Sequence, residues 1–206
     1  METLISRYKR LLAATSTAYI RNLMNTIHWS NRLIAIRGAR GVGKTTLMLQ
    51  YLKLNYTPDG REALYASLDS GYFTRHTLSE LVEQFYLRGG KHLFLDEVHK
   101  YPGWSREIKN AYDEYPDLKI VFSGSSLLQI LNAEADLSRR CISYDMQGLS
   151  FREYLHFYHQ IEIRPYTLDE ILFQPDNLCA EVNGKCRPLA YFDDYLKVGY
   201  YPFRLE

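Results

Sequence analysis

A nine-residue stretch combines glycines, a lysine and two threonines at a spacing that suits phosphate binding. It satisfies the pattern G-x-x-x-x-G-K-[ST] and has the sequence Gly38-Ala39-Arg40-Gly41-Val42-Gly43-Lys44-Thr45-Thr46. Glycines let the backbone curl so that successive N–H groups point at a phosphate chain, and a following helix adds the positive end of its dipole. Lys44 would reach the β and γ phosphates, and the Thr45 hydroxyl would ligate Mg²⁺. The stretch therefore predicts a loop whose nine residues hold a nucleotide such as ATP.

Two adjacent carboxylates, Asp96 and Glu97, close a short apolar run that begins at His92. Such a run predicts a buried parallel strand that delivers its acids to the carboxyl end of a sheet, where ligands bind in open α/β folds. Asp96 would hold Mg²⁺, usually through its water shell, and Glu97 would polarise the attacking water. A solvated strand end is the alternative for an isolated pair. The pair follows Lys44 by 52 residues (96 minus 44) with one strand–helix unit between, which favours the catalytic interpretation.

A third polar stretch, Ser123-Gly124-Ser125-Ser126, follows a predicted strand at 118–122. A small hydroxyl at that position can hydrogen-bond the attacking water or a γ-phosphate, and we predict this role for Ser123. A serine can also cap a helix, and we predict that role for Ser125 or Ser126 ahead of a helix at 127–132.

The elements that must position these residues are short strands separated by helices. Apolar runs predict strands at 32–37, 63–69, 92–97, 118–122 and 141–146. Helical spacing of apolar residues predicts helices at 45–54, 77–88 and 104–115. The helix at 77–88 would be capped by Thr77 or Ser79 and stopped by Gly89.

The two ends of the chain have helical patterns of their own. Residues 1–27 predict two amphipathic helices, separated near 15–17, that cover one edge of the sheet. An alternative places the segment at 27–32 over the nucleotide's base, with Trp29 as a stacking ring. Beyond Leu149 we predict three short helices separated by prolines and a glycine, at 150–159, 167–173 and 189–197.

Composition excludes several classes of protein. The 206 residues are 46% hydrophobic and 24% charged, which suits one α/β domain with a small appendage. A net charge of +1 gives no overall positive field that would attract nucleic acid, and three cysteines are too few for a disulfide framework. The sequence lacks an apolar run of about eighteen residues and the apolar core of a signal peptide. We therefore expect a cytoplasmic protein with no membrane partner.

Several motifs in the same order make the chain resemble the AAA+-like, STAND-related P-loop ATPases of bacteria and archaea. The family's motifs are G-x-R-x-V-G-K-T-T, L-D-E-[VI]-H, W-x-x-x-[IL]-K, [ST]-G-S-S, G-R and L-S-F-x-E-[YF]-L. Their counterparts here are 38–46, 95–99, 104–109, 123–126, 139–140 and 149–155. The adjacent Asp and Glu also favour the branch of phosphate-loop proteins that uses a catalytic glutamate. The resemblance covers roughly residues 30–203.

The resemblance implies a fold and a set of roles. It implies an α/β P-loop fold with a five-stranded parallel sheet in the order 5-1-4-3-2, sandwiched by helices, and ATP hydrolysis with Mg²⁺. It also implies an arginine finger just before the fifth strand, which by alignment is Arg140. Arg139 replaces the family's usual glycine, which leaves open which of the two arginines acts; the alternative is a surface arginine pair.

The expected organisation is an ATPase core with N-terminal helices at 1–148 and a helical lid-like region at 149–206. The final residues resemble a segment from which the family continues into a C-terminal domain, so we expect an effector domain to be missing.

Three functions remain open at this point. The first is a Mg²⁺-dependent ATPase that couples its nucleotide state to an effector. Its expected ligands are ATP and ADP, and its expected partners are further copies of the same chain in a homo-oligomer. The second is a nucleotide-gated interaction switch with negligible turnover. The third is a DNA-processing ATPase, which salt-dependent DNA binding would favour.

Overall fold

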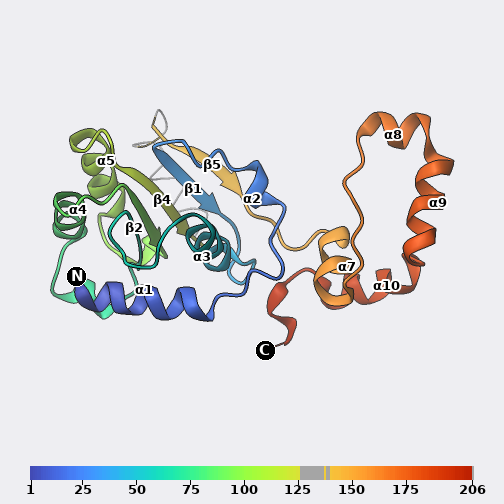
Figure 1. Cartoon of the computed structure of the whole chain (residues 1–206), viewed down its shortest axis with the longest axis horizontal. Helices are drawn as coiled ribbons and strands as arrows, with labels where there is room; N and C mark the ends of the chain where they lie inside the picture. The colour runs from blue at the N-terminus through green and yellow to red at the C-terminus, as the bar shows by residue number, and fades with distance from the viewer. Residues whose placement is uncertain (126–136, 138–139, 206) are drawn as a thin grey trace. The chain divides into compact units, whose positions relative to one another are not determined.

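The computed structural model describes residues 1–125, 137 and 140–205 (Figure 1). These residues form two compact units, Met1–Met146 and Gln147–Glu206. The predicted helix at 127–132, the proposed cap Ser126 and one arginine of the predicted pair, Arg139, lie outside the described residues.

The first unit is built on a five-stranded parallel sheet with the strand order β2-β3-β4-β1-β5 (Figure 1). The strands are β1 (Leu33–Arg37), β2 (Ala63–Ser67), β3 (His92–Asp96), β4 (Lys119–Gly124) and β5 (Ile142–Asp145). Their continuous apolar runs are typical of parallel strands that are covered on both faces. This order confirms the predicted 5-1-4-3-2 sheet, counted from the opposite edge.

Helices connect the strands and cover both faces of the sheet. Among the described residues of this unit, the helices are α1 (Glu2–Ala14), α2 (Leu23–Thr26), α3 (Lys44–Asn55), α4 (Leu78–Leu87) and α5 (Trp104–Glu114), with 3₁₀ turns η1 (Gly71–Thr74) and η2 (Val98–Lys100). Because parallel crossovers are right-handed, α3 lies on one face and α4 and α5 lie on the other (Figure 1). Helix α4 begins with a capping box, in which the Thr77 side chain accepts from the Glu80 N–H. Of the two predicted caps for this helix, the structure therefore selects Thr77.

The prediction of two N-terminal helices that cover one edge of the sheet holds only for α1, which packs on β2. The second predicted helix is the four-residue α2, which has no buried residue. Helix α1 packs against β2 and α3 and buries Leu4, Tyr8 and Leu12. Trp29 stacks on Tyr51 of α3 with ring centroids 3.8 Å apart, and its Nε1 donates to the Met24 carbonyl over 3.0 Å. The ring of Trp29 is thus part of the packing on α3, which favours the covering role over the stacking of a base.

The second unit is helical. It contains α7 (Phe151–His159), α8 (Leu168–Phe173), α9 (Pro175–Lys185) and α10 (Leu189–Asp194), followed by the π-helical turn η3 (Tyr195–Gly199) and η4 (Pro202–Leu205). Helix α9 corrects the prediction that Pro175 and Gly184 only separate helices. Pro175 occupies the first turn of α9, where its missing N–H has no intrahelical partner to lose. Gly184 lies in the last turn of the same helix, where the helix tolerates it.

Among the described residues, each helix is too short or too polar to cross a lipid bilayer.

Candidate nucleotide site

The loop between β1 and α3 has the backbone that its glycines predict. Gly43 is the N-cap of α3 and has a left-handed conformation with φ of 102°, which favours glycine. At Gly38 an added Cβ atom would lie 2.3 Å from the carbonyl oxygen of Met146, so a larger residue would push the loop away from the end of β5. The loop therefore needs glycine at both positions, and it places the amino end of α3 at the carboxyl edge of the sheet.

Lys44, the first residue of α3, folds over this loop. Its Nζ donates to the carbonyl oxygens of Gly38 over 2.7 Å and of Ala39 over 2.8 Å. Burial lowers the pKa of the Lys44 ammonium, while the nearby carboxylates of Glu97 and Asp96 act in the opposite direction. The loop thus holds one buried cation beside two acids, a composition that suits a phosphate chain with its metal.

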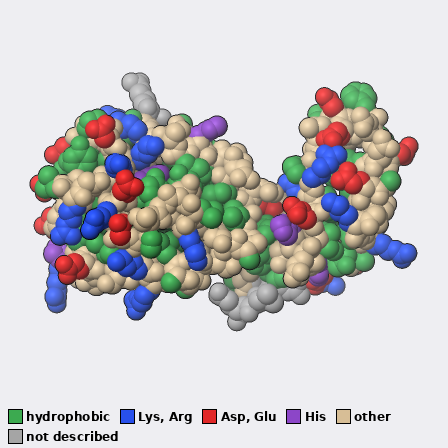
Figure 2. All heavy atoms as spheres, viewed as in Figure 1, with side chains coloured by type: hydrophobic (Ala, Val, Ile, Leu, Met, Phe, Trp, Pro, Cys, Tyr) green, Lys and Arg blue, Asp and Glu red, His purple; other side chains and the backbone are tan. Residues whose placement is uncertain are grey.

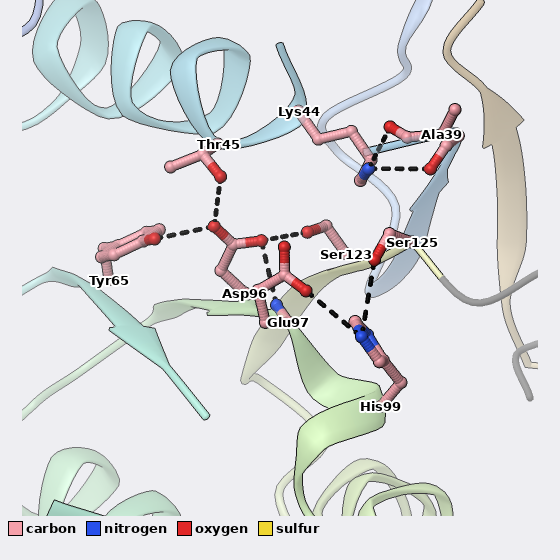
Figure 3. A network of polar contacts seen from close by, with 10 residues as sticks. Ala39, Lys44, Thr45, Tyr65, Asp96, Glu97, His99, Ser123 and Ser125 are labelled. Carbon is pink, nitrogen blue, oxygen red and sulfur yellow. Dashed lines mark hydrogen bonds and ion pairs between the residues drawn. The ribbon is translucent and has the colours of Figure 1, made fainter. Parts of the chain in front are cut away.

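The carboxylate of Asp96 is the centre of the polar network in Figure 3. Its Oδ2 accepts from the Thr45 hydroxyl over 2.5 Å and from the Tyr65 hydroxyl over 2.7 Å. Its Oδ1 accepts from the Ser123 hydroxyl and from the backbone N–H of Glu97, the latter over 3.0 Å. An ionised carboxylate has about four lone-pair positions, so these four donors account for its accepting capacity. A carboxylate that is only 2% exposed is therefore held in one orientation.

Glu97 leaves the strand in a left-handed conformation, with φ of 53° and ψ of 40°. A residue other than glycine adopts this conformation at an energetic cost, and such residues cluster at functional sites. One of its carboxylate oxygens lies 3.4 Å from His99 Nε2, and the same nitrogen lies 3.4 Å from the Ser125 hydroxyl (Figure 3). His99 therefore faces the carboxylate of Glu97. Ser125, predicted as a helix cap, also contacts His99.

The structure brings most of the predicted site residues together. Lys44, Thr45, Asp96, Glu97 and Ser123 lie at the carboxyl edge of the sheet (Figure 3). Within the loop, Ala39, Arg40, Gly41 and Thr46 are exposed, while Val42 is buried.

Arg140 lies elsewhere. It precedes β5, at the amino end of the strand, whereas the phosphate loop follows β1 at the carboxyl end of the same sheet. Its guanidinium forms two hydrogen bonds to the Asp113 carboxylate, over 2.9 and 3.1 Å. The predicted finger is therefore not part of its own chain's phosphate site in this structure.

Mg²⁺ fits this donor set, although the described residues contain no group of three or more His, Cys, Asp or Glu side chains that could hold a metal. Mg²⁺ normally keeps several waters and binds through one or two protein oxygens together with the phosphates of a nucleotide. The Thr45 hydroxyl, which donates to Asp96, keeps its oxygen lone pairs for such a bond beside the loop. Thr45 would therefore ligate the ion, and Asp96, whose four accepting positions are used, would hold it through its negative charge.

Two residues at the site have no counterpart in the sequence predictions. Arg21 is buried, and its guanidinium donates to the Val42 carbonyl over 2.8 Å, so that it supports the phosphate loop from behind. Tyr65, on β2, donates to Asp96. An arginine between two helical segments and a tyrosine in an apolar strand have ordinary patterns, so neither carries a signal of this role.

A family model described as an AAA domain matches residues 30–155, more than half of the chain. The chain belongs to the AAA domain family. It is also similar to two uncharacterised proteins of Methanocaldococcus jannaschii, which are 31% and 23% identical over 84% of this chain. The chain spans 39% and 36% of the lengths of these two relatives.

Solved structures of low sequence identity are also similar. AMPPCP-bound DnaA from Aquifex aeolicus matches with a TM-score of 0.46 at 16% identity, over 94% of this chain and 59% of that chain. The Saccharomyces cerevisiae Hsp104–ADP complex matches with a TM-score of 0.46 at 16% identity, over 79% of this chain and 25% of that chain. The family match, together with the observed sheet and loop, supports a nucleotide-binding, ATPase-like function for the chain.

Proposed function

We propose that the chain binds ATP with Mg²⁺ and hydrolyses it to ADP and phosphate. The observation that carries the proposal is the convergence of Lys44, Thr45, Asp96 and Glu97 at one edge of the sheet, around a buried and fully hydrogen-bonded carboxylate. A phosphate loop alone would support binding only. The second carboxylate, turned out of the strand beside the buried one, supports a reaction with water.

Each residue has a distinct task in this proposal. A water molecule oriented by Glu97 attacks the γ-phosphorus, forms a new P–O bond and gives up a proton to the carboxylate. The bond between the γ-phosphorus and the bridging oxygen breaks, and ADP leaves. Lys44 stabilises the charge on the phosphate oxygens. Mg²⁺, when bound, would neutralise part of the same charge and orient the phosphates.

Ser123 has a structural contact that bears on its predicted role. Its hydroxyl donates to Asp96, so the hydroxyl oxygen remains able to accept from a water molecule. We keep the proposal that Ser123 senses the γ-phosphate through the attacking water. His99, which faces Glu97, would keep that carboxylate directed toward the water.

The position of Arg140 supports action on a neighbouring subunit. Four residues of β5 span about 13 Å between Arg140 and the loop side of the sheet, so the guanidinium is remote from its own γ-phosphate. In a ring or filament of copies, the arginine of one subunit would complete the site of the next, after releasing Asp113. A homo-oligomer is therefore the partner that this proposal requires.

The reaction is tested by steady-state ATP turnover with Glu97→Gln. This variant should keep its affinity for ATP and lose turnover by about 10²-fold or more, the scale of a lost general base. Glu83→Gln, which changes an exposed carboxylate on α4, is the matched control and should behave as the parent. Equal turnover in the parent and in Glu97→Gln would remove Glu97 from the mechanism.

A second candidate is a nucleotide-gated switch with negligible turnover. The observation that favours it is Arg140, which is bound to Asp113 rather than directed at a phosphate. A parent chain that binds ATP tightly and does not hydrolyse it at any protein concentration would favour the switch.

A DNA-processing ATPase is the third candidate. On the face drawn in Figure 2, Lys and Arg side chains lie among Asp and Glu side chains, so that face offers no broad basic surface for a phosphate backbone.

The chain matches about two fifths of the length of its two relatives. The proposal therefore includes coupling of the nucleotide state to an effector, for which the unmatched part of the relatives is the candidate.

A further inference from the structure

Tyr65 lies on the strand beside the one that carries the predicted metal-binding acid. In the register of β2 and β3, Tyr65 is opposite Phe94 and Ser67 is opposite Asp96. Asp96 is therefore the diagonal neighbour of Tyr65 on the same face of the sheet, a position within reach of an aromatic side chain. The tyrosine hydroxyl uses that reach and donates to Asp96 Oδ2 over 2.7 Å (Figure 3). The ring is only 5% exposed, so the hydroxyl is fixed by its packing.

The hydrogen bonds to Asp96 divide between its two oxygens. Oδ1 accepts from β4 and from the backbone, whereas Oδ2 accepts from Tyr65 and from Thr45. Thr45 has a single hydroxyl proton, and while that proton points at Oδ2 the oxygen lone pairs point away from the carboxylate. This is the orientation in which a threonine hydroxyl can ligate a cation. The direction of the Thr45 hydroxyl thus depends on where Oδ2 lies.

We propose that Tyr65 is a positioning residue that sets how strongly Mg²⁺ enhances nucleotide binding. Its hydroxyl fixes Asp96 Oδ2, and Oδ2 in turn orients the Thr45 hydroxyl toward the metal. The terminal torsion of an aspartate is broad, so a carboxylate that loses one of its two Oδ2 donors can rotate. Tyr65 touches neither substrate nor metal in this role. The inference rests on the proposed nucleotide site.

A purely structural tyrosine would behave differently. If its ring only filled the core, loss of the hydroxyl would lower stability but would change nucleotide binding equally with and without Mg²⁺. The positioning role predicts a change in the metal-dependent part alone. The ratio of the two affinities therefore separates the two roles.

The experiment measures binding of AMPPCP, an ATP analogue that is not hydrolysed between its β and γ phosphorus atoms, to the full chain by calorimetry. Each protein is titrated once in EDTA and once at saturating Mg²⁺. In Tyr65→Phe the affinity in EDTA should match the parent within about twofold. The gain in affinity from Mg²⁺ should fall about tenfold, the scale of one hydrogen bond to a charged group.

Tyr56→Phe is the matched control. Its hydroxyl contacts His92 Nδ1 over 2.9 Å, so this variant also removes a hydrogen-bonded tyrosine hydroxyl from the same unit without touching Asp96. It should keep the parent's gain from Mg²⁺. Tyr65→Leu, which also lacks the donor, replaces Tyr65→Phe if the latter does not fold, and it should lose the gain as well.

Two results would overturn the inference while leaving the proposed function intact. One is a gain in AMPPCP affinity from Mg²⁺ that is as large in Tyr65→Phe and Tyr65→Leu as in the parent. The other is an equal loss of affinity in EDTA and in Mg²⁺, which would assign Tyr65 to the core. A parent that binds no AMPPCP under either condition would contradict the proposed function, and this inference with it.

Discussion

The two units of the molecule differ in what they bury and in the chemistry that they carry. In the first unit β3 is buried along its whole length, and α3 buries half of its residues. In the second unit α8, α9 and α10 bury none of theirs. Among the second-unit side chains whose burial the structure describes, the large apolar ones that are exposed are Leu168, Ile171, Leu172, Phe173, Leu189, Phe192, Leu196, Val198, Tyr200 and Phe203. Every predicted site residue, in contrast, belongs to the first unit.

The two units are therefore stabilised by different interactions. Burial of apolar area is the main favourable term in folding, and the first unit has most of it. The second unit depends on the packing of α7 and on local contacts, such as the bond from the Tyr154 hydroxyl to Asp194 over 2.6 Å and the capping box at Thr167. We expect the helices α8–α10 to open at lower free energy than the sheet.

The largest predicted effect tests the claim that the first unit carries all the chemistry. A protein with Arg139→Ala and Arg140→Ala should lose about 10³–10⁵ in turnover, the scale of an arginine finger, and Lys44→Ala should be inactive. Mixing the two should restore part of the activity, because the Lys44→Ala copy supplies in trans the arginines that the intact phosphate site of the other copy lacks. The measurement is ATP turnover against the mixing ratio. A fast, concentration-independent ATPase from a proven monomer would contradict the action between subunits.

The next prediction compares two phenylalanines. Phe94 on β3 is fully buried against Tyr51 and His92, whereas Phe173 at the end of α8 is 77% exposed. Phe94→Ala should lower the free energy of unfolding by about 3–5 kcal/mol, and Phe173→Ala should change it by less than about 0.5 kcal/mol. Both tryptophans of the chain lie in the first unit, so their fluorescence during denaturation reports that unit. A similar loss in both variants would mean that Phe173 contributes to the stability of the first unit.

The smallest predicted effect uses the same capping box in each unit. Thr77 caps α4 and Thr167 caps α8, each with a glutamate three residues later. Thr77→Ala should lower the stability reported by tryptophan fluorescence by about 1 kcal/mol, because α4 packs on the sheet. Thr167→Ala should leave that transition unchanged and increase hydrogen exchange in α8 alone. If Thr167→Ala also shifted the tryptophan transition, the two units would unfold together and the comparison would fail.

The sheet can be predicted from the sequence, and candidate residues can be placed at its carboxyl edge, because both steps depend on local patterns. The apolar runs that form β1 and β3 are interrupted at the residues where the strands end. The glycines, Lys44 and Thr45 form one continuous motif that can be recognised from neighbouring residues alone. The position of Asp96 can be predicted because it is the last residue of an apolar run, and such a run forms a strand, here β3, that ends at the carboxyl edge of the sheet.

The roles of Tyr65 and Arg21 cannot be predicted from the sequence because they depend on contacts between residues that are distant in the chain. Tyr65 has the same alternation as any core tyrosine, and only the register of β2 with β3 brings it to Asp96. In the sequence, Arg21 has the pattern of a solvated helix residue. Only the folded structure shows that its guanidinium donates to the Val42 carbonyl. Helix α9 departs from the prediction because Pro175 occupies its first turn, where a helix tolerates a proline.

Calorimetry of Mg²⁺-ATP with Lys44→Ala tests whether the loop at 38–46 binds a nucleotide. This substitution removes the buried cation that folds over the loop, and we predict that tight binding is abolished. Lys53→Ala, which changes an exposed lysine of the same helix, is the control and should bind as the parent does. Binding of Mg²⁺-ATP by Lys44→Ala with the parent's affinity would contradict the account.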